Sequence, residues 1–156
     1  MHDIHTHIGQ FYQTKYDFHN IFMALKNNGI TETTFAYLTP LFTESKPAID
    51  FYYEMTQETK DALDFAKKID LKVNPLYWID PMVLFGGITL ESILNDLDYK
   101  GLVVHPFLND WNPSDEKRAN LLTQIFEFAE KKNYEIYFHT GCSPTDNPLN
   151  FEKWFV

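Results

Sequence analysis

Hydrophobic and polar positions follow two different periods along the chain, and together they predict strands that alternate with helices. Short runs rich in β-branched and aromatic residues are typical of strands, whereas apolar residues at three- and four-residue steps are typical of helices. The predicted strands cover residues 2–8, 31–38, 71–79, 101–106 and 134–140. The predicted helices cover residues 17–28, 48–69 and 89–97, a stretch that follows Ser114, and residues 151–156.

Polar residues with short side chains stand where several of these helices begin. Asp17, Thr89, Ser114 and Asn150 each precede a helical stretch, and residues of these types satisfy the free amide groups at a helix N-terminus. Gly29 follows the first predicted helix, at a position where glycine commonly ends a helix. We therefore expect these residues to set helix boundaries.

The regular alternation of strands and helices predicts an α/β fold with parallel strands and right-handed crossovers. The segment 101–106 is a nearly continuous apolar run, which is typical of a strand buried on both faces. No internal repeat or low-complexity tract interrupts the chain, so residues 1–156 are expected to form a single domain.

Composition narrows the classes of function. The 156 residues are 44% hydrophobic and 17% aromatic, which favours an ordered core. The net charge of -9 and the lack of a basic cluster argue against a nucleic-acid partner. No apolar run approaches the ~20 residues of a membrane span. The single cysteine, Cys142, and a first strand that starts next to Met1 predict a reducing, cytoplasmic setting without a signal peptide.

The histidines give the clearest chemical signal. His5 and His7 are two residues apart on the first predicted strand, so their side chains point to the same face. Neutral imidazole binds zinc and also suits iron and nickel, so the pair predicts half of a metal site. Of the six histidines, His2 and His19 are expected to be structural or exposed to solvent.

Two further histidines, His105 and His139, end the fourth and fifth predicted strands. In α/β proteins this end of the sheet is where binding sites are built. A single histidine at a strand end is more often a satisfied polar residue than a ligand, but a pair on one strand together with histidines on two others favours a metal. A set of three histidine ligands leaves an open coordination position, as catalytic metal sites do.

Residues 3–9 (DIHTHIG), 101–106 (GLVVHP) and 138–141 (FHTG) together resemble the amidohydrolase superfamily, in particular the amidohydrolase-related metal-dependent hydrolases, which include decarboxylases. The resemblance implies a TIM-barrel-like (β/α)8 fold, present here as about five β/α units. It also implies a divalent metal held by His5, His7 and His139, with zinc the first expectation and iron, manganese or nickel the alternatives. The aspartate that helps to activate the metal-bound water in the family would lie beyond the chain end, so this chain is expected to be the N-terminal portion of a barrel.

The expected activity is hydrolysis of an amide or ester bond of a small molecule. A decarboxylase on the same scaffold is one alternative, and an inactive metal-binding or interaction fragment is another. A barrel of the polymerase-and-histidinol-phosphatase type also opens with two such histidines. Strand edges left open at the first and fifth predicted strands would allow a homo-oligomer.

The roles of the remaining polar residues are less defined. Val103 occupies the inward position two residues before His105, where relatives with two metals carry a carboxylate or modified lysine. We therefore expect either one metal or a His105 that supports the metal ligands or contacts the substrate, and His105 is a candidate catalytic residue. Asp3 should share a face with His5 and His7 as a buried structural carboxylate. Cys142 is expected to be an inert thiol. Further candidates for lining a pocket are Tyr37, Trp78, Asp80, Phe107, Asn109 and Trp111.

Overall fold

The protein is described from a computed structural model, in which residues 1–11, 14–38, 48–85, 87–105 and 114–139 are described. The predicted cap Asn150, the predicted helix 151–156 and Cys142 lie outside these residues. So do three candidates for lining a pocket, Phe107, Asn109 and Trp111.

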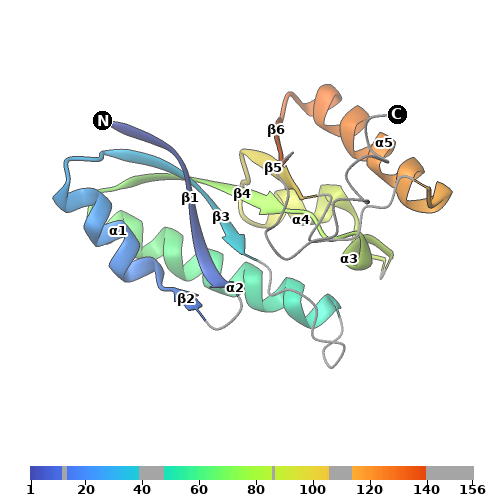
Figure 1. Cartoon of the computed structure of the whole chain (residues 1–156). Helices are drawn as coiled ribbons and strands as arrows, with labels where there is room; N and C mark the ends of the chain where they lie inside the picture. The colour runs from blue at the N-terminus through green and yellow to red at the C-terminus, as the bar shows by residue number, and fades with distance from the viewer. Residues whose placement is uncertain (12–13, 39–47, 86, 106–113, 140–156) are drawn as a thin grey trace.

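A mostly parallel sheet of six strands, ordered β2-β1-β3-β4-β5-β6, forms the framework (Figure 1). The strands are β1 (His2–Phe11), β2 (Thr14–Tyr16), β3 (Glu32–Leu38), β4 (Lys72–Trp78), β5 (Gly101–Val104) and β6 (Glu135–Phe138). Apart from the antiparallel β1–β2 pair, each strand is parallel to its neighbour. The parallel strands follow chain order, so each β/α unit adds one strand to the same side of the sheet.

Five described helices connect or follow the strands. They are α1 (Phe18–Asn27), α2 (Ala48–Lys68), α3 (Pro81–Phe85), α4 (Leu90–Asp96) and α5 (Glu116–Lys132). Figure 1 shows α1 and α2 on one side of β1, β3 and β4. Among the described residues, no helix has both the length and the apolar character needed to cross a membrane.

The helix boundaries test the predicted caps. The side chains of Asp17 and Thr89 each accept a hydrogen bond from the backbone amide three residues later, so both N-caps are confirmed. The cap predicted at Ser114 is wrong: Asp115 caps α5, and its carboxylate accepts hydrogen bonds from the amides of Lys117 and Arg118. One carboxylate oxygen can accept from both amides, so Asp115 satisfies two of the free groups at this helix end.

The two faces of the sheet differ in what covers them. On one face, strand residues such as Ile8, Phe35 and Leu102 pack with buried side chains from all five helices. On the other face lies a smaller cluster to which no described helix contributes. That cluster consists of Ala36, Leu38, Leu76, Trp78 and Val103, with Tyr137 packed against it. Because alternate residues of β5 belong to the two clusters, the prediction that this strand is buried on both faces is confirmed.

The sheet begins differently from the prediction. The first strand was expected to end at Ile8, but β1 continues to Phe11 and pairs with β2, a hairpin that the pattern did not predict. Gly9 allows this continuation because it has φ +100, and a Cβ there would lie 2.9 Å from the Tyr37 ring. The described strands at the two edges of the sheet are therefore β2 and β6, and β2 replaces the first predicted strand as one edge.

A bulge in β1 overturns the predicted orientation of Asp3. Asp3 is in register with Thr33 and Thr6 with Phe35, so β1 holds one extra residue between them. The Thr33 hydroxyl donates a hydrogen bond to the Asp3 carboxylate (2.7 Å), and Thr33, two residues before Phe35, shares the face that packs against the helices. Asp3 therefore does not share a face with His5 and His7 as expected, although it is a partly buried carboxylate bound to the framework.

Candidate functional site

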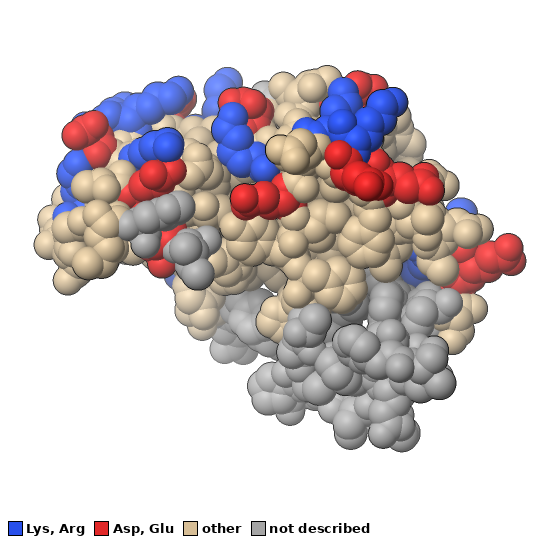
Figure 2. Space-filling view, turned by 90° about the horizontal axis from the view of Figure 1, so that it is seen from above, with Lys and Arg blue, Asp and Glu red and all other residues tan. Residues whose placement is uncertain are grey.

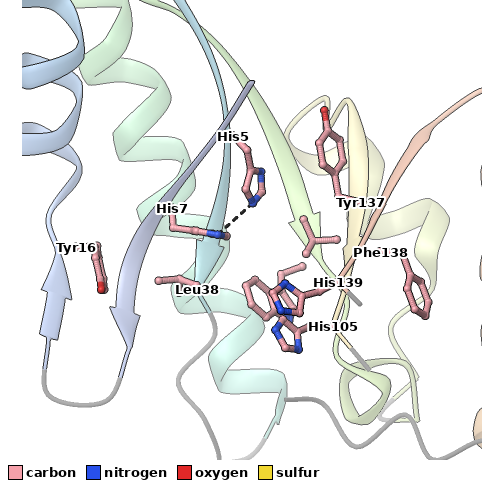
Figure 3. A pocket seen from close by; sticks show the side chains of 10 residues that line it. His5, His7, Tyr16, Leu38, His105, Tyr137, Phe138 and His139 are labelled. Carbon is pink, nitrogen blue, oxygen red and sulfur yellow. Dashed lines mark hydrogen bonds between the residues drawn. The ribbon is translucent and has the colours of Figure 1, made fainter. Parts of the chain in front are cut away.

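A cavity of about 510 Å³ lies at the carboxyl ends of the parallel strands, on the sheet face to which no described helix contributes (Figure 3). It is lined by His5, His7, Tyr16, Leu38, Trp78, Val103, His105, Tyr137, Phe138 and His139. The four histidines singled out from the sequence thus line one cavity. They reach it because two lie on β1 and the other two come directly after β5 and β6.

His5 and His7 form the first wall of the cavity. Their Nε2 atoms are 3.1 Å apart, and the rings meet edge to face with centroids 4.4 Å apart (Figure 3). The Nδ1 atoms of both rings are buried and have no hydrogen-bond partner within the described part of the chain. Buried polar atoms are nearly always satisfied, so such orphaned nitrogens call for an explanation such as a bound ion or water.

The separation of the two Nε2 atoms fits a shared ligand. Two nitrogens bound to one tetrahedral zinc at about 2.0–2.1 Å lie about 3.3 Å apart. The observed 3.1 Å is close to that spacing, and it also fits a hydrogen bond between two neutral rings, one donating and one accepting. The pair can therefore hold either a proton or a metal ion between its two Nε2 atoms.

His105 and His139 form the opposite wall. Their rings are stacked, with centroids 3.9 Å apart and an interplanar angle of 17°. A backbone hydrogen bond from the His139 amide to the Val104 carbonyl (2.9 Å) fixes the two strand ends side by side. His105 is buried, with 6% of its surface exposed, whereas His139 is exposed.

Two larger aromatic rings support these walls. Tyr137 is stacked on His5 with centroids 5.5 Å apart, and its hydroxyl donates a hydrogen bond to the Glu135 carboxylate (3.2 Å). Trp78 lies almost parallel to His105, with centroids 5.3 Å apart, and is tilted against His7 at 6.0 Å. Trp78 therefore touches one histidine from each wall, which ties the two pairs together.

The protein environment keeps the inner histidines neutral. Burial lowers the pKa of His7 to about 4, and the neighbouring His5 adds to this effect. Burial also lowers the pKa of His105 to about 3, with a further contribution from His139. The pKa of His5 is lowered by burial as well, against an opposing effect of the Asp3 carboxylate. Neutral imidazole is the form that binds metal ions, so these rings are in the required state at neutral pH.

The structure groups the predicted ligands in pairs. His5, His7 and His139 line the same cavity, but His139 is stacked with His105, and its recorded interaction with the His5–His7 pair is electrostatic: it contributes to lowering the pKa of both rings. Within the described residues, no three His, Cys, Asp or Glu side chains lie close enough together to hold one metal ion. The described residues thus supply two histidines whose nitrogens are close enough to share one metal ion, His5 and His7. The other two, His105 and His139, line a different part of the cavity.

The other candidates for lining the pocket divide between the two faces. Trp78 lines the cavity as expected, and Val103 lies beside His105. Tyr37 instead belongs to the core beneath the helices, and burial together with Glu58 raises the pKa of its phenol. Asp80 is not among the residues that line the cavity, and its charge contributes to raising the pKa of the buried Tyr77.

Sequence reasoning missed several residues of the cavity. Tyr137 could have been found, because it lies two residues before His139 on a strand and therefore shares its face. Leu38 and the predicted candidate Tyr37 are consecutive residues of one strand, so they point to opposite faces. Choosing between them required knowing which face the helices cover. Tyr16 could not be placed because it lies on the hairpin that the pattern did not predict.

Comparison of the chain with protein families, with characterised proteins and with solved structures found no match. A fold of this class hosts many unrelated activities, so function has to be argued from the site. The residues that line the cavity and their geometry therefore carry the inference that follows.

Proposed function

We propose that this chain is part of a metal-dependent hydrolase of the amidohydrolase type, in which His5 and His7 hold a divalent cation and His139 is the third ligand. The observation that carries the proposal is the His5–His7 pair, whose Nε2 atoms lie 3.1 Å apart on the wall of the cavity. Zinc fits this donor set best, and iron, manganese and nickel also accept imidazole nitrogen.

The arrangement of the sheet supports this proposal. Its parallel strands are added in chain order, and the described helices all contribute to the core on one face. A (β/α)8 barrel is built in this way, with helices outside, strand side chains inside and the active site at the carboxyl ends of the strands. We propose that the described sheet is the first part of such a barrel, and the cavity lies where the active site would be.

The chemistry assigns a role to each wall. A divalent metal polarises a carbonyl group and lowers the pKa of bound water to about 7. In this proposal the imidazoles of His5 and His7 bind the metal, while Leu38 and Val103 exclude water from one side of the cavity. The role we propose for His105, whose ring lies between Trp78 and His139 and lines the cavity, is to contact the substrate with its edge. The volume of about 510 Å³ is within the range of small-molecule sites.

A decarboxylase on the same scaffold is the second candidate. No carboxylate is among the described residues that line the cavity, so a metal held by neutral imidazoles would keep a net positive charge. Such a metal favours carboxylate as well as hydroxide as the exchangeable ligand. Release of carbon dioxide from carboxylated substrates, without hydrolysis of amides or esters, would select this candidate.

Metal content per chain tests the proposal. Wild type, His5→Ala and the matched control His19→Ala are purified in parallel, dialysed against zinc and analysed by mass spectrometry. His19 is an exposed histidine of α1 that lies outside the cavity. Wild type and the control should each retain about one metal ion, whereas His5→Ala should retain at least about tenfold less. Equal metal content in all three proteins would reject the site.

Turnover is then measured with the metal-loaded chain on a panel of amides, esters and carboxylates. Hydrolysis that disappears with the metal supports the first candidate. A chain that binds metal but turns over none of the panel would be a metal-binding protein without this activity.

A further inference from the structure

Aromatic rings surround the cavity almost continuously. Each ring contacts the next in the sequence Tyr137, His5, His7, Trp78, His105 and His139, with centroid separations of 5.5, 4.4, 6.0, 5.3 and 3.9 Å. The first and last rings of this series lie two residues apart on the same strand end, so the series turns back on itself. Any molecule in the cavity therefore meets mainly ring faces and edges.

Three of these rings lie one on the other in a stack, the ring platform. The Trp78 indole and the His105 imidazole are parallel within 5°, and the His139 imidazole lies within 17° of His105. His139 is the outermost ring of the platform and is exposed, whereas Trp78 and His105 are buried. Parallel rings attract a further planar ring by offset stacking, and the platform ends where a ligand can reach it.

The described residues of the lining carry no acidic or basic side chain apart from the histidines. Among the described residues that line the cavity there is no Asp, Glu, Lys or Arg, although the chain as a whole carries a net charge of -9. Figure 2 shows acidic and basic side chains interspersed over one face of the molecule, so charge is available outside the cavity. A charged group placed against the ring platform would lose hydration without gaining an ionic partner there.

We propose that the cavity binds its substrate through a planar, uncharged ring that stacks on His139, the outermost ring of the platform that Trp78, His105 and His139 form. The inference deepens the proposed function, on which it rests for the identity of the bound molecule as substrate. It specifies the part of the substrate that lies away from the metal, and it assigns His139 a second role as a stacking surface. The stacking surface itself needs no metal and can be tested in the metal-free chain.

Binding of three small probes tests the ring preference. The chain is treated with a chelator, and calorimetry at pH 8 compares benzamide with cyclohexanecarboxamide, which is not planar, and with benzoate, which is charged. Benzamide should bind about tenfold more tightly than either of the others, because only benzamide is both planar and neutral. Equal affinity for the three probes, or preference for either control, would overturn the proposal.

Two substitutions of the exposed His139 separate this inference from the metal site. His139→Phe keeps a ring but has no metal-binding nitrogen, whereas His139→Ala has neither. His139→Phe should bind benzamide within about twofold of wild type, and His139→Ala should bind it about tenfold more weakly. Unchanged binding of benzamide by His139→Ala would overturn the platform. Thermal unfolding of both variants checks that each remains folded.

Metal content of the same two variants reads out the proposed function independently. Both should lose metal if His139 is a ligand, whatever their affinity for benzamide. Normal metal content in both, with benzamide binding lost only in His139→Ala, would remove His139 from the ligand set and leave the stacking surface standing. Loss of metal in both, with equal affinity for all three probes, would keep His139 in the ligand set and overturn the stacking surface.

Discussion

The two faces of the sheet use the same strands for different purposes. Toward the helices, residues such as Ile8, Phe35 and Leu102 are completely buried in a continuous apolar core. On the other face, the intervening positions carry histidines and aromatic rings around a cavity. Neighbouring residues of one strand point to opposite faces. The residues that stabilise the core and the residues that line the cavity therefore alternate along the same strands.

The largest expected effect comes from the face toward the helices. Leu102→Ala removes a completely buried side chain from β5 and should lower the free energy of unfolding by about 2–5 kcal/mol. His139→Ala, on the cavity side, should change it by less than about 0.5 kcal/mol because the side chain is exposed. Urea denaturation of both variants measures the contrast, and similar losses in the two would break it.

The second effect is a dependence of stability on pH that originates on the cavity face. His7 and His105 have pKa values of about 4 and about 3 in the folded chain. In the unfolded chain a histidine pKa is about 6.5, so between these values the unfolded state binds more protons. The free energy of unfolding is therefore at its full value above about pH 6.5. It falls as the pH decreases toward 4, by up to about 3 kcal/mol for each buried ring.

Urea denaturation of the metal-free chain at pH 7.5 and at pH 5 measures this loss. His105→Gln removes one of the titrating rings and should reduce the difference between the two pH values. A free energy of unfolding that is the same at both values would contradict the buried, neutral state of the histidines.

The third effect sharpens the comparison at the start of the sheet. Gly9→Ala places a Cβ at φ +100 and 2.9 Å from the Tyr37 ring, so both strain and a clash result. Gly29→Ala is the matched control, since Gly29 has φ +76 but no atom within 4 Å of the added carbon. We expect Gly9→Ala to lower the free energy of unfolding by about 2 kcal/mol and Gly29→Ala to lower it by about 1 kcal/mol. Equal losses in thermal unfolding would show that the clash with Tyr37 is relieved at no cost.

The smallest effect concerns the ring that supports His5. Tyr137→Phe keeps the stack and loses only the exposed hydrogen bond to Glu135, so zinc affinity should stay within about twofold of wild type. Tyr137→Leu loses the stacked ring and should weaken zinc binding by about tenfold, as loss of a neighbour that orients a ligand commonly does. Competition with a zinc indicator measures both affinities, and equal values would show that the stack does not position His5.

Local signals in the sequence were sufficient for much of the framework. Asp17 and Thr89 cap their helices because the capping hydrogen bond reaches only three residues along the chain. The strands that bring His105 and His139 to the cavity follow from apolar runs that end at these residues. The α/β class with a largely parallel sheet was predicted for the same reason.

Features that depend on partners distant in the sequence could not be predicted in this way. The bulge that turns Asp3 toward Thr33 is set by the register between β1 and β3, which no local pattern encodes. The β1–β2 hairpin depends on Gly9 adopting a positive φ beside Tyr37. The pairing of His139 with His105 follows from the hydrogen bond to Val104. The barrel, the metal and the hydrolase activity stay predictions that experiment has to test.

The most direct test of the central claim is a nitrogen-15 NMR titration of the histidine rings with zinc. The account predicts that the Nε2 signals of His5 and His7 shift together and reach their end point at about one equivalent, while the signals of His19 stay in place. The response of His139 in the same spectra shows whether it is the third ligand. If the signals of His5 and His7 do not move, or move only after the exposed His19 has bound zinc, the pair is not a metal site.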